Sequence, residues 1–210
     1  RVISSEWLLP KLLELKNDAL DVYSKTIYYM EAGDWLVSRL TNHLIRSNCM
    51  AGFKGLWQKD GGFLKREDLL AIDEDFADLY STKLAGEVLP AGTKAGYLTK
   101  QQGKLLGLHE DVVVAVPIID AHSAIVGAGL SKSNEMLIVI GTSSCHLLLS
   151  NEESLIPGVS GVVEDGVYEN LYAFEAGQVA VGDIFSYFVK EQLPSVYFEE
   201  AKRNNQSIFD

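Results

Sequence analysis

The chain has 210 residues, enough for one large domain or for parts of two. Its 29 acidic and 18 basic residues give a formal net charge of -11, which argues against a nucleic-acid partner, because phosphate backbones bind to clustered Lys and Arg. The longest apolar run, residues 112–119, is too short to cross a bilayer, which takes ~18 residues, so we expect no membrane partner.

The cysteines and the two ends of the chain give two further expectations. Cys49 and Cys145 lie far apart and lack the spacing of metal ligands, so we expect two reduced thiols and a cytoplasmic location. The first residue is Arg1, and residues 204–210 contain no clear stop. We therefore expect this chain to be an internal piece of a longer protein.

The first part of the chain is predicted to be helical. Pro10 is tolerated in a first helical turn and opens the first expected helix. Apolar residues recur near helical spacing in two further segments, residues 34–40 and 73–84. The helices expected in this part cover residues 10–15, 18–30, 34–40, 48–57 and 73–84, and a turn at 60–62 follows the fourth.

An alternation of helix and strand follows, and it predicts an α/β layer. A turn at 90–92 leads to a helix over 100–106, with Thr99 as its N-cap and Gly107 at its end. Residues 112–116 form an apolar run rich in β-branched residues, which is typical of a parallel strand buried on both faces. This strand leads to Asp120, and a Gly- and Ala-rich helix is expected over 121–130.

From residue 136 onward the pattern predicts an antiparallel sheet. Residues 136–140 and 145–149 flank the short segment 141–144, which is typical of a hairpin. A strand near 171–174 and a helix over 177–191 complete the expected elements. We expect a domain boundary within 127–133, where the α/β pattern gives way to the hairpin.

Asp120 has the sharpest position of any polar residue. It follows the predicted strand and opens the next helix, and open α/β sheets bind their ligands at that edge. The free N–H groups of the helix favour a charged carboxylate there. The same position also suits an ordinary helix N-cap, worth about 1 kcal/mol, and position alone does not exclude that interpretation.

Three other polar segments are open to two interpretations. Gly141, Thr142 and Ser143 offer small residues and free backbone N–H groups that can close on phosphate oxygens, or they form a plain hairpin turn. Glu175 lies between a strand and a helix, where it binds a ligand or stabilises the helix dipole. Lys54 lies between glycines in an apolar helix, so its ammonium enters a cleft or extends to solvent.

The histidines and tryptophans are expected to be structural. His122 and His146 are not spaced as metal ligands, so no metal site is predicted, and we expect partly buried, hydrogen-bonded histidines. The tryptophans are predicted to be core residues rather than a stacking platform: Trp7, Trp35 and Trp57.

Together, these segments resemble one family, the FGGY carbohydrate kinases. Residues 119–129, IDAHSAIVGAG, resemble the "DAH…VGAG" segment of that family, and GTSSCH at 141–146 resembles its phosphate loop. FEAGQ at 174–178 resembles its "EAGQ…GD" segment. Upstream, EAGDWL at 31–36 and CMAGFK at 49–54 look most like the ribulokinase branch. The resemblance covers essentially the whole chain, in the same order and spacing.

The resemblance implies a fold and a division into domains. FGGY kinases have two domains of the actin-like (ribonuclease H-like) ATPase fold, an α/β fold, and sugar and ATP meet between them. By this likeness, residues 1–128 are the C-terminal part of the N-terminal, sugar-binding domain. Residues 129–210 are the beginning of the C-terminal, ATP-binding domain.

The resemblance also implies roles for the polar residues. Asp120 matches the catalytic base of the family, which takes the proton of the attacking sugar hydroxyl. Lys54 and Glu175 match residues that bind sugar hydroxyls together with that aspartate, and residues 141–143 match the loop that receives ATP phosphates. The activity implied is the transfer of a phosphoryl group from ATP to L-ribulose, giving L-ribulose 5-phosphate in arabinose catabolism.

The implied cofactors are ATP and Mg²⁺, and the main residue that places magnesium is expected outside this chain. We therefore expect the 210-residue chain alone to be inactive. Two alternatives stay open, a kinase for another sugar such as xylulose and a non-catalytic actin-like binding module. The chain is also compatible with a homo-oligomer.

Overall fold

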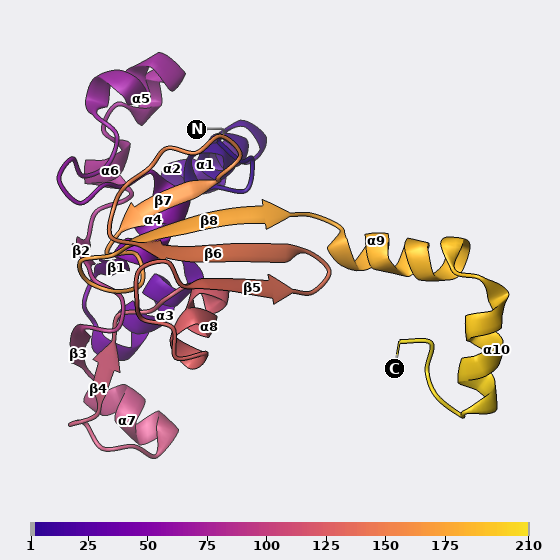
Figure 1. Cartoon of the computed structure of the whole chain (residues 1–210). Coiled ribbons are helices and arrows are strands. Elements are labelled where there is room, and N and C mark those ends of the chain that lie inside the picture. The colour runs from indigo at the N-terminus through magenta and orange to yellow at the C-terminus, as the bar shows by residue number, and fades with distance from the viewer. Residues whose placement is uncertain (1–2, 210) are drawn as a thin grey trace.

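The computed structural model describes residues 3–209, and in these residues the chain forms helices and three sheets (Figure 1). A parallel pair joins β1 (Ile45–Ser47) to β2 (Glu87–Leu89), and an antiparallel pair joins β3 (Lys94–Tyr97) to β4 (Val113–Ala115). The largest sheet is antiparallel, in the order β5-β6-β8-β7. Its strands are β5 (Met136–Ile140), β6 (Ser144–Ser150), β7 (Gly161–Glu164) and β8 (Tyr172–Gln178).

The N-terminal part is helical, as the sequence predicts, but the helices are shorter and more numerous. Its helices are α1 (Leu8–Asp18), α2 (Leu20–Lys25), α3 (Ala32–Thr41), α4 (Asn48–Gly55), α5 (Arg66–Ile72) and α6 (Leu79–Thr82). The helices expected at 34–40 and 48–57 are confirmed as α3 and α4. The first helix begins two residues before Pro10, and α5 was not predicted.

Two predicted helices in this part are wrong in extent, and hydrogen bonds explain both. The helix expected over 18–30 ends at Lys25, because Lys83 holds the following residues in another conformation. Its ammonium donates to the backbone carbonyls of Tyr23 and Thr26, and its backbone carbonyl accepts from the amide of Tyr29. The helix expected over 73–84 is broken into a 3₁₀ turn (Glu74–Phe76) and α6. The Asp73 carboxylate accepts from the Asp75 amide and starts a new turn there.

The middle of the chain confirms one helix and corrects one strand. Helix α7 (Lys100–Leu106) begins after Thr99, whose hydroxyl accepts from the Gln102 amide, and ends at Gly107 with a φ of 68°. The strand expected to be parallel and buried on both faces is instead β4, which pairs antiparallel with β3 and leaves Val113 exposed. An apolar run does not by itself reveal which neighbours cover it.

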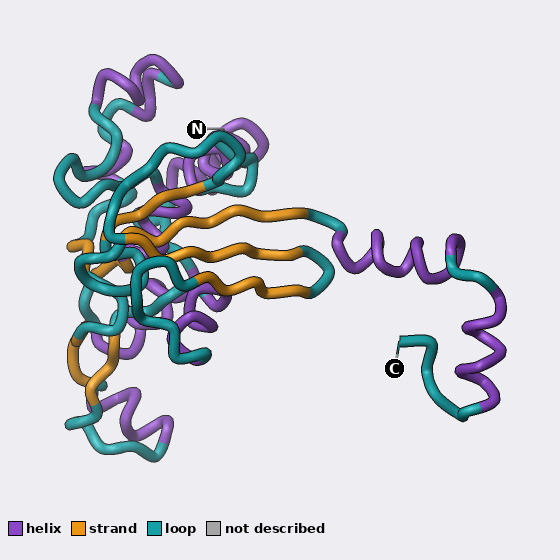
Figure 2. The backbone as a smooth tube through the Cα atoms, viewed as in Figure 1, coloured by secondary structure: helices purple, strands orange, loops and turns teal. Residues whose placement is uncertain are grey.

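The hairpin of β5 and β6 is confirmed, with Met136 opposite Leu148 and Ile140 opposite Ser144. The strand expected near 171–174 continues to Gln178, because β8 pairs with β6 along the whole length of that strand (Figure 2). The helix expected over 177–191 therefore starts later, as α9 (Val181–Tyr187), and continues into a π-helical segment (Phe188–Gln192). Strand β7 and helix α10 (Ser195–Arg203) were not predicted.

The main core lies between one face of the large sheet and two helices, α4 and α8 (Asp120–Gly127). Its buried members are Cys49, Phe53, Ile125, Leu147, Leu149, Val163, Val167 and Ala173. The two cysteines are free thiols, as expected, and Cys49 is fully buried. Among the tryptophans, the core prediction holds for Trp7, is wrong for Trp35, which is 54% exposed, and holds only partly for the half-buried Trp57.

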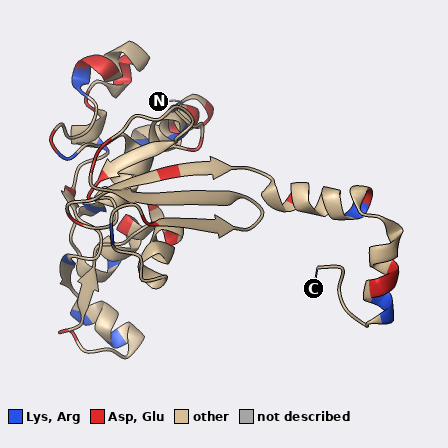
Figure 3. Cartoon of the chain, in the orientation of Figure 1, with Lys and Arg blue, Asp and Glu red and all other residues tan. Residues whose placement is uncertain are grey.

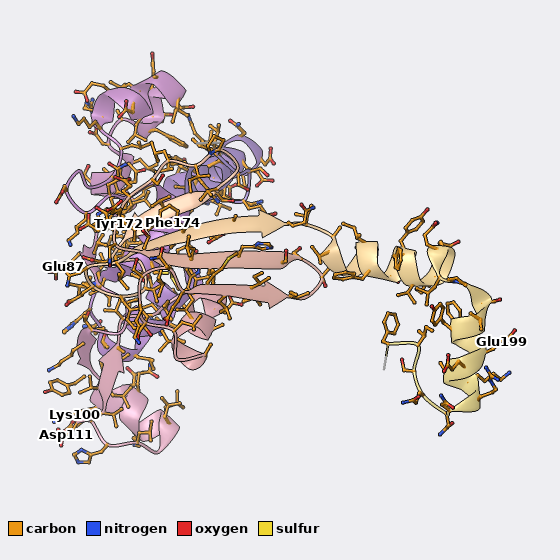
Figure 4. The ribbon with its side chains drawn as sticks, viewed as in Figure 1. Glu87, Lys100, Asp111, Tyr172, Phe174 and Glu199 are labelled. Atoms are coloured by element: carbon orange, nitrogen blue, oxygen red, sulfur yellow. The ribbon has the colours of Figure 1, made fainter. Side chains whose placement is uncertain are left out.

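The C-terminal helices extend away from this core as an arm (Figure 1). Glu199 of α10 lies far from Tyr172 and Phe174, which stand on β8 in the body of the protein (Figure 4). Three large apolar side chains of this arm are exposed: Ile184, Phe185 and Phe188. No helix in the described residues is long and apolar enough to span a membrane.

Candidate functional site

Glu175 is a carboxylate on the apolar face of the large sheet. It lies within β8, opposite Leu147 of β6, and not at the strand-to-helix edge that the sequence predicted. Because side chains alternate between faces, Glu175 shares its face with Leu147, Leu149 and Ala173, which are core residues. It is the only Asp, Glu, Lys or Arg residue of β5, β6 and β8 (Figure 3). A charge in this position needs partners.

Lys54 of α4 is one of those partners. Its ammonium Nζ lies 3.6 Å from Oε1 of Glu175, and both side chains are mostly buried, with 31% and 17% exposed. The close approach of α4 to the sheet explains the pair, because a Cβ at Gly52 would lie 2.4 Å from Cγ1 of Val163 on β7. The glycine before Lys54 thus serves packing, whereas the sequence interpretation was that glycines leave the lysine stem uncovered.

Asp120 is the first residue of α8 and is exposed. Its Oδ1 accepts from the Ala121 amide at 2.8 Å. The strand before it is β4, which is neither parallel nor buried, so the predicted ligand edge of a parallel sheet does not exist there. Helix α8 instead packs against the large sheet through Ile125 and His122.

His122 joins the two parts of this site, and it differs from the partly buried, hydrogen-bonded histidine that we expected. The ring is fully buried, lies 4.3 Å from the Phe53 ring between centroids, and places Nε2 3.4 Å from Oε2 of Glu175. Burial, with a smaller effect of the Lys54 charge, lowers the pKa of His122 to about 4, although Asp120 opposes the shift. The imidazole is therefore neutral near pH 7. His146, by contrast, is half-buried and pairs with Ser144 at 3.0 Å.

The same surroundings connect Asp120 with Glu175. Burial raises the pKa of the Cys145 thiol, and the negative charges of Glu175 and Asp120 add to that rise, while Lys54 opposes it. The geometric link is His122, which lies two residues after Asp120 on α8 and 3.4 Å from Oε2 of Glu175. The structure thus brings Lys54, Asp120 and Glu175 into one neighbourhood, from α4, α8 and β8.

Three buried or half-buried charges behind Lys54 were not assigned a role from the sequence. Asp34 of α3 accepts from the Ser47 amide at 2.8 Å, and burial raises its pKa to about 6. Burial also raises the pKa of Glu31, against the opposing charges of Lys54 and Arg46. The Arg46 guanidinium binds the backbone carbonyls of Tyr29, Leu84 and Ala85.

The turn of residues 141–143 joins β5 to β6 and is exposed. The Gly141 amide donates to the Ser143 carbonyl, and the Gly182 amide donates to the Thr142 carbonyl. A Cβ at Gly182 would lie 3.1 Å from the Gly141 carbonyl oxygen, so the start of α9 packs closely on this turn. Residues 141–143 are all exposed, so the turn remains accessible from solvent.

The described residues contain no group of three or more His, Cys, Asp or Glu side chains that could hold a metal ion. A groove of about 1410 Å³ lies beside α8 and is lined by Ser123, Val126, Pro117 and Tyr168 among others. Lys54, Asp120 and Glu175 do not line it. The candidate site is therefore separate from this groove.

Comparisons with known proteins give a consistent family. Residues 136–208 match the family model for the FGGY family of carbohydrate kinases, C-terminal domain. The chain is 39% identical over 208 residues to the ribulokinase of Geobacillus thermodenitrificans and 42% identical over 209 residues to that of Staphylococcus aureus strain MRSA252. Both matches cover 99% of this chain but only 37% and 38% of the relatives, so the chain spans little more than a third of their length.

A solved structure shows the same fold. The crystal structure of xylulose kinase from Rhodospirillum rubrum superposes with a TM-score of 0.71 over 93% of this chain and 39% of that protein, at 17% sequence identity. The fold is therefore the actin-like (ribonuclease H-like) ATPase fold that FGGY sugar kinases share. By sequence and by fold, the chain is thus similar to carbohydrate kinases of the FGGY family, whose C-terminal domain matches residues 136–208.

Proposed function

We propose that this chain carries the sugar site and part of the nucleotide site of an ATP-dependent ribulokinase. The reaction transfers the γ-phosphoryl group of ATP to L-ribulose and gives L-ribulose 5-phosphate, a step of arabinose catabolism in the cytoplasm. Residues 1–128 belong in this proposal to the sugar-binding domain, and residues 129–210 to the ATP-binding domain. The ribulokinase relatives at 39–42% identity support this choice of sugar.

One observation carries the proposal, the meeting of Lys54 and Glu175 beside Asp120. The pair is oppositely charged, 3.6 Å apart and mostly buried, which suits a ligand rich in hydroxyl groups. Hydroxyls both donate and accept, and charge-assisted hydrogen bonds discriminate strongly between hydroxyl geometries. Lys54 accordingly donates to the sugar, and Glu175 accepts from it.

Asp120 is the catalytic base in this proposal. Phosphoryl transfer passes through a loose transition state, so the main requirements are in-line positioning and charge stabilisation. The free Oδ2 of Asp120 orients the attacking hydroxyl and takes its proton, while Oδ1 stays fixed by the Ala121 amide. The exposed position of Asp120 leaves it accessible to a bound sugar.

The turn of residues 141–143 receives ATP phosphate oxygens in this proposal. Its small residues and exposed hydroxyls fit such a ligand, since a Cβ at Gly141 would meet only the Ser143 carbonyl oxygen, at 3.7 Å. Magnesium would add positive charge at the phosphates, but residues 3–209 offer no metal centre of their own. In this proposal the main residue that places the metal belongs to another part of the complete protein, and no step here depends on it.

The deciding experiment replaces Asp120 by Asn in the complete protein that contains this chain. We expect phosphoryl transfer to L-ribulose to be lost while L-ribulose binding, measured by titration calorimetry, is largely kept. Unchanged activity would remove Asp120 from the mechanism. A panel of ketopentoses tests the sugar, because xylulose preferred over ribulose would contradict the assignment. The 210-residue chain alone is expected to be inactive, since most of the length of its relatives is missing.

A further inference from the structure

Glu175 has two neighbours of different kinds, and each faces a different carboxylate oxygen. Oε1 lies 3.6 Å from the Lys54 ammonium, and Oε2 lies 3.4 Å from Nε2 of His122. Lys54 is on α4, His122 on α8 and Glu175 on β8, so the carboxylate is held between two helices on the apolar face of the sheet. Its orientation decides which hydrogen bonds a ligand can form.

The protonation state of His122 limits what the ring can do. Burial keeps it neutral near pH 7, and Lys54, Asp120 and Glu175 are the charged groups around it. A neutral imidazole carries one N–H. Both ring nitrogens are buried, and within the described residues neither has a hydrogen bond of full geometry. Because Oε2 of Glu175 lies 3.4 Å from Nε2, we place the single proton of the ring on Nε2.

We propose that His122 is a positioning residue for Glu175. Its Nε2–H directs Oε2, so that Oε1 stays opposite Lys54 and the carboxylate presents one fixed geometry to a sugar hydroxyl. The inference rests on the proposed function, because it concerns the same sugar site. His122 itself is fully buried and does not touch the ligand.

His122 also connects the helix that carries Asp120 to the strand that carries Glu175. It lies two residues after Asp120 on α8, and its contact with Glu175 connects that helix to β8. A shift of α8 relative to the sheet would therefore move the base and the Glu175 contact together. The Phe53 ring, 4.3 Å away, supports the imidazole from α4. If His122 were only structural, its packing against Phe53 would be its whole role. The test therefore has to separate this packing from the hydrogen bond that Nε2–H donates to Glu175.

Two amide substitutions separate these roles in the complete protein. His122→Gln places an amide N–H near the position of Nε2, whereas His122→Asn is one methylene shorter and does not reach Glu175. Both are neutral and polar, so they share the cost of burying an amide. We expect His122→Gln to keep the L-ribulose dissociation constant close to that of the parent. We expect His122→Asn to raise it about 3- to 10-fold, which is less than the effect of a full hydrogen bond to a charged group, because the contact between Nε2 and Oε2 is 3.4 Å long.

The readouts are titration calorimetry with L-ribulose, titration with ATP, and thermal unfolding of each variant. The ATP dissociation constant should stay unchanged in both variants. Equal L-ribulose affinities for the Gln and Asn variants would overturn the inference, and so would a loss of ATP affinity as large as that for sugar. If one amide variant fails to fold, His122→Leu replaces it. A His122→Leu variant that binds L-ribulose as tightly as the parent protein would also overturn the inference.

A double-mutant cycle that combines His122→Asn with Glu175→Gln completes the test. Once Glu175 is changed, His122→Asn should cost little further L-ribulose affinity, because both changes remove the same interaction. Additive losses would contradict the proposal. Failure of the parent protein to bind L-ribulose would overturn the proposed function together with this inference. Parent binding with identical Gln and Asn variants would overturn only the role of His122.

Discussion

The buried imidazole of His122 makes a quantitative prediction for stability against pH. Its folded-state pKa is lowered from 6.5 to about 4 by burial, so the unfolded chain binds the proton more tightly. The stabilisation is fully present above pH 6.5 and is lost as pH falls from 6.5 toward 4. Between pH 7 and pH 5 this one group should lower the free energy of unfolding by about 2 kcal/mol.

Asp34 opposes this trend and has to be separated from it. Burial raises the pKa of Asp34 from 3.8 to about 6, so the folded chain binds that proton more tightly. The stability from Asp34 is present below pH 3.8 and is lost as pH rises through 6. As the pH falls from 7 to 5, protonation of Asp34 should raise the free energy of unfolding by about 1 kcal/mol. The unmodified chain therefore shows only a small net dependence from these two groups.

Single substitutions reveal the two opposing contributions. Residue 122 cannot titrate in the His122→Gln variant, so Asp34 alone of these two groups should raise the free energy of unfolding, by about 1 kcal/mol, between pH 7 and pH 5. In the matched control, Asp34→Asn, the free energy of unfolding should instead fall by about 2 kcal/mol as the pH falls from 7 to 5. Urea unfolding of the chain at pH 7, 6 and 5 measures both. Parallel pH dependences for the His122→Gln variant and the parent would refute the buried, neutral histidine.

Three further predictions follow from packing, capping and thiol burial. Gly52→Ala should destabilise the chain by about 1–3 kcal/mol in thermal unfolding, because its Cβ would lie 2.4 Å from Val163, whereas Gly127→Ala has open space and should be neutral or stabilising. Thr99→Ala should cost about 1 kcal/mol by removing the N-cap of α7, and Thr99→Ser should restore it. Cys49 should resist a thiol reagent until the chain unfolds, since it is fully buried and burial raises its pKa to about 12; labelling of Cys49 in the folded chain would contradict this.

Local residue chemistry made some elements of the fold predictable. The cap at Thr99 and the stop at Gly107 depend on residues within one helical turn, and the hairpin depends on two apolar strands with a short polar turn between them. The breaks were not predictable in the same way. The helix expected over 18–30 ends because Lys83, far along the chain, binds its carbonyls. The extent of β8 depends on the length of its partner, β6.

In the candidate site, too, the sequence predicts local features, whereas the tertiary contacts could not be predicted. Asp120 was recognised as a helix-opening carboxylate, and it does open α8, but the buried parallel strand expected before it was wrong. Glu175 was placed at the end of a strand, whereas pairing with β6 puts it inside β8 on the core face. The meeting of Glu175 with Lys54 depends on Gly52 packing against Val163, which is a tertiary contact. The resemblance named these residues, and it gave no geometry for them.

The position of Glu175 also explains how such a site can favour a sugar. A carboxylate on the apolar face of a sheet loses hydration on folding, and its contacts to Lys54 and His122, at 3.6 Å and 3.4 Å, are longer than good hydrogen bonds. Part of that cost is therefore not recovered by the protein itself. A ligand that brings several hydroxyls can donate to Glu175 and accept from Lys54 at the same time. Binding then satisfies groups whose desolvation has already occurred, whereas an analogue that lacks one hydroxyl leaves a buried charge without its partner.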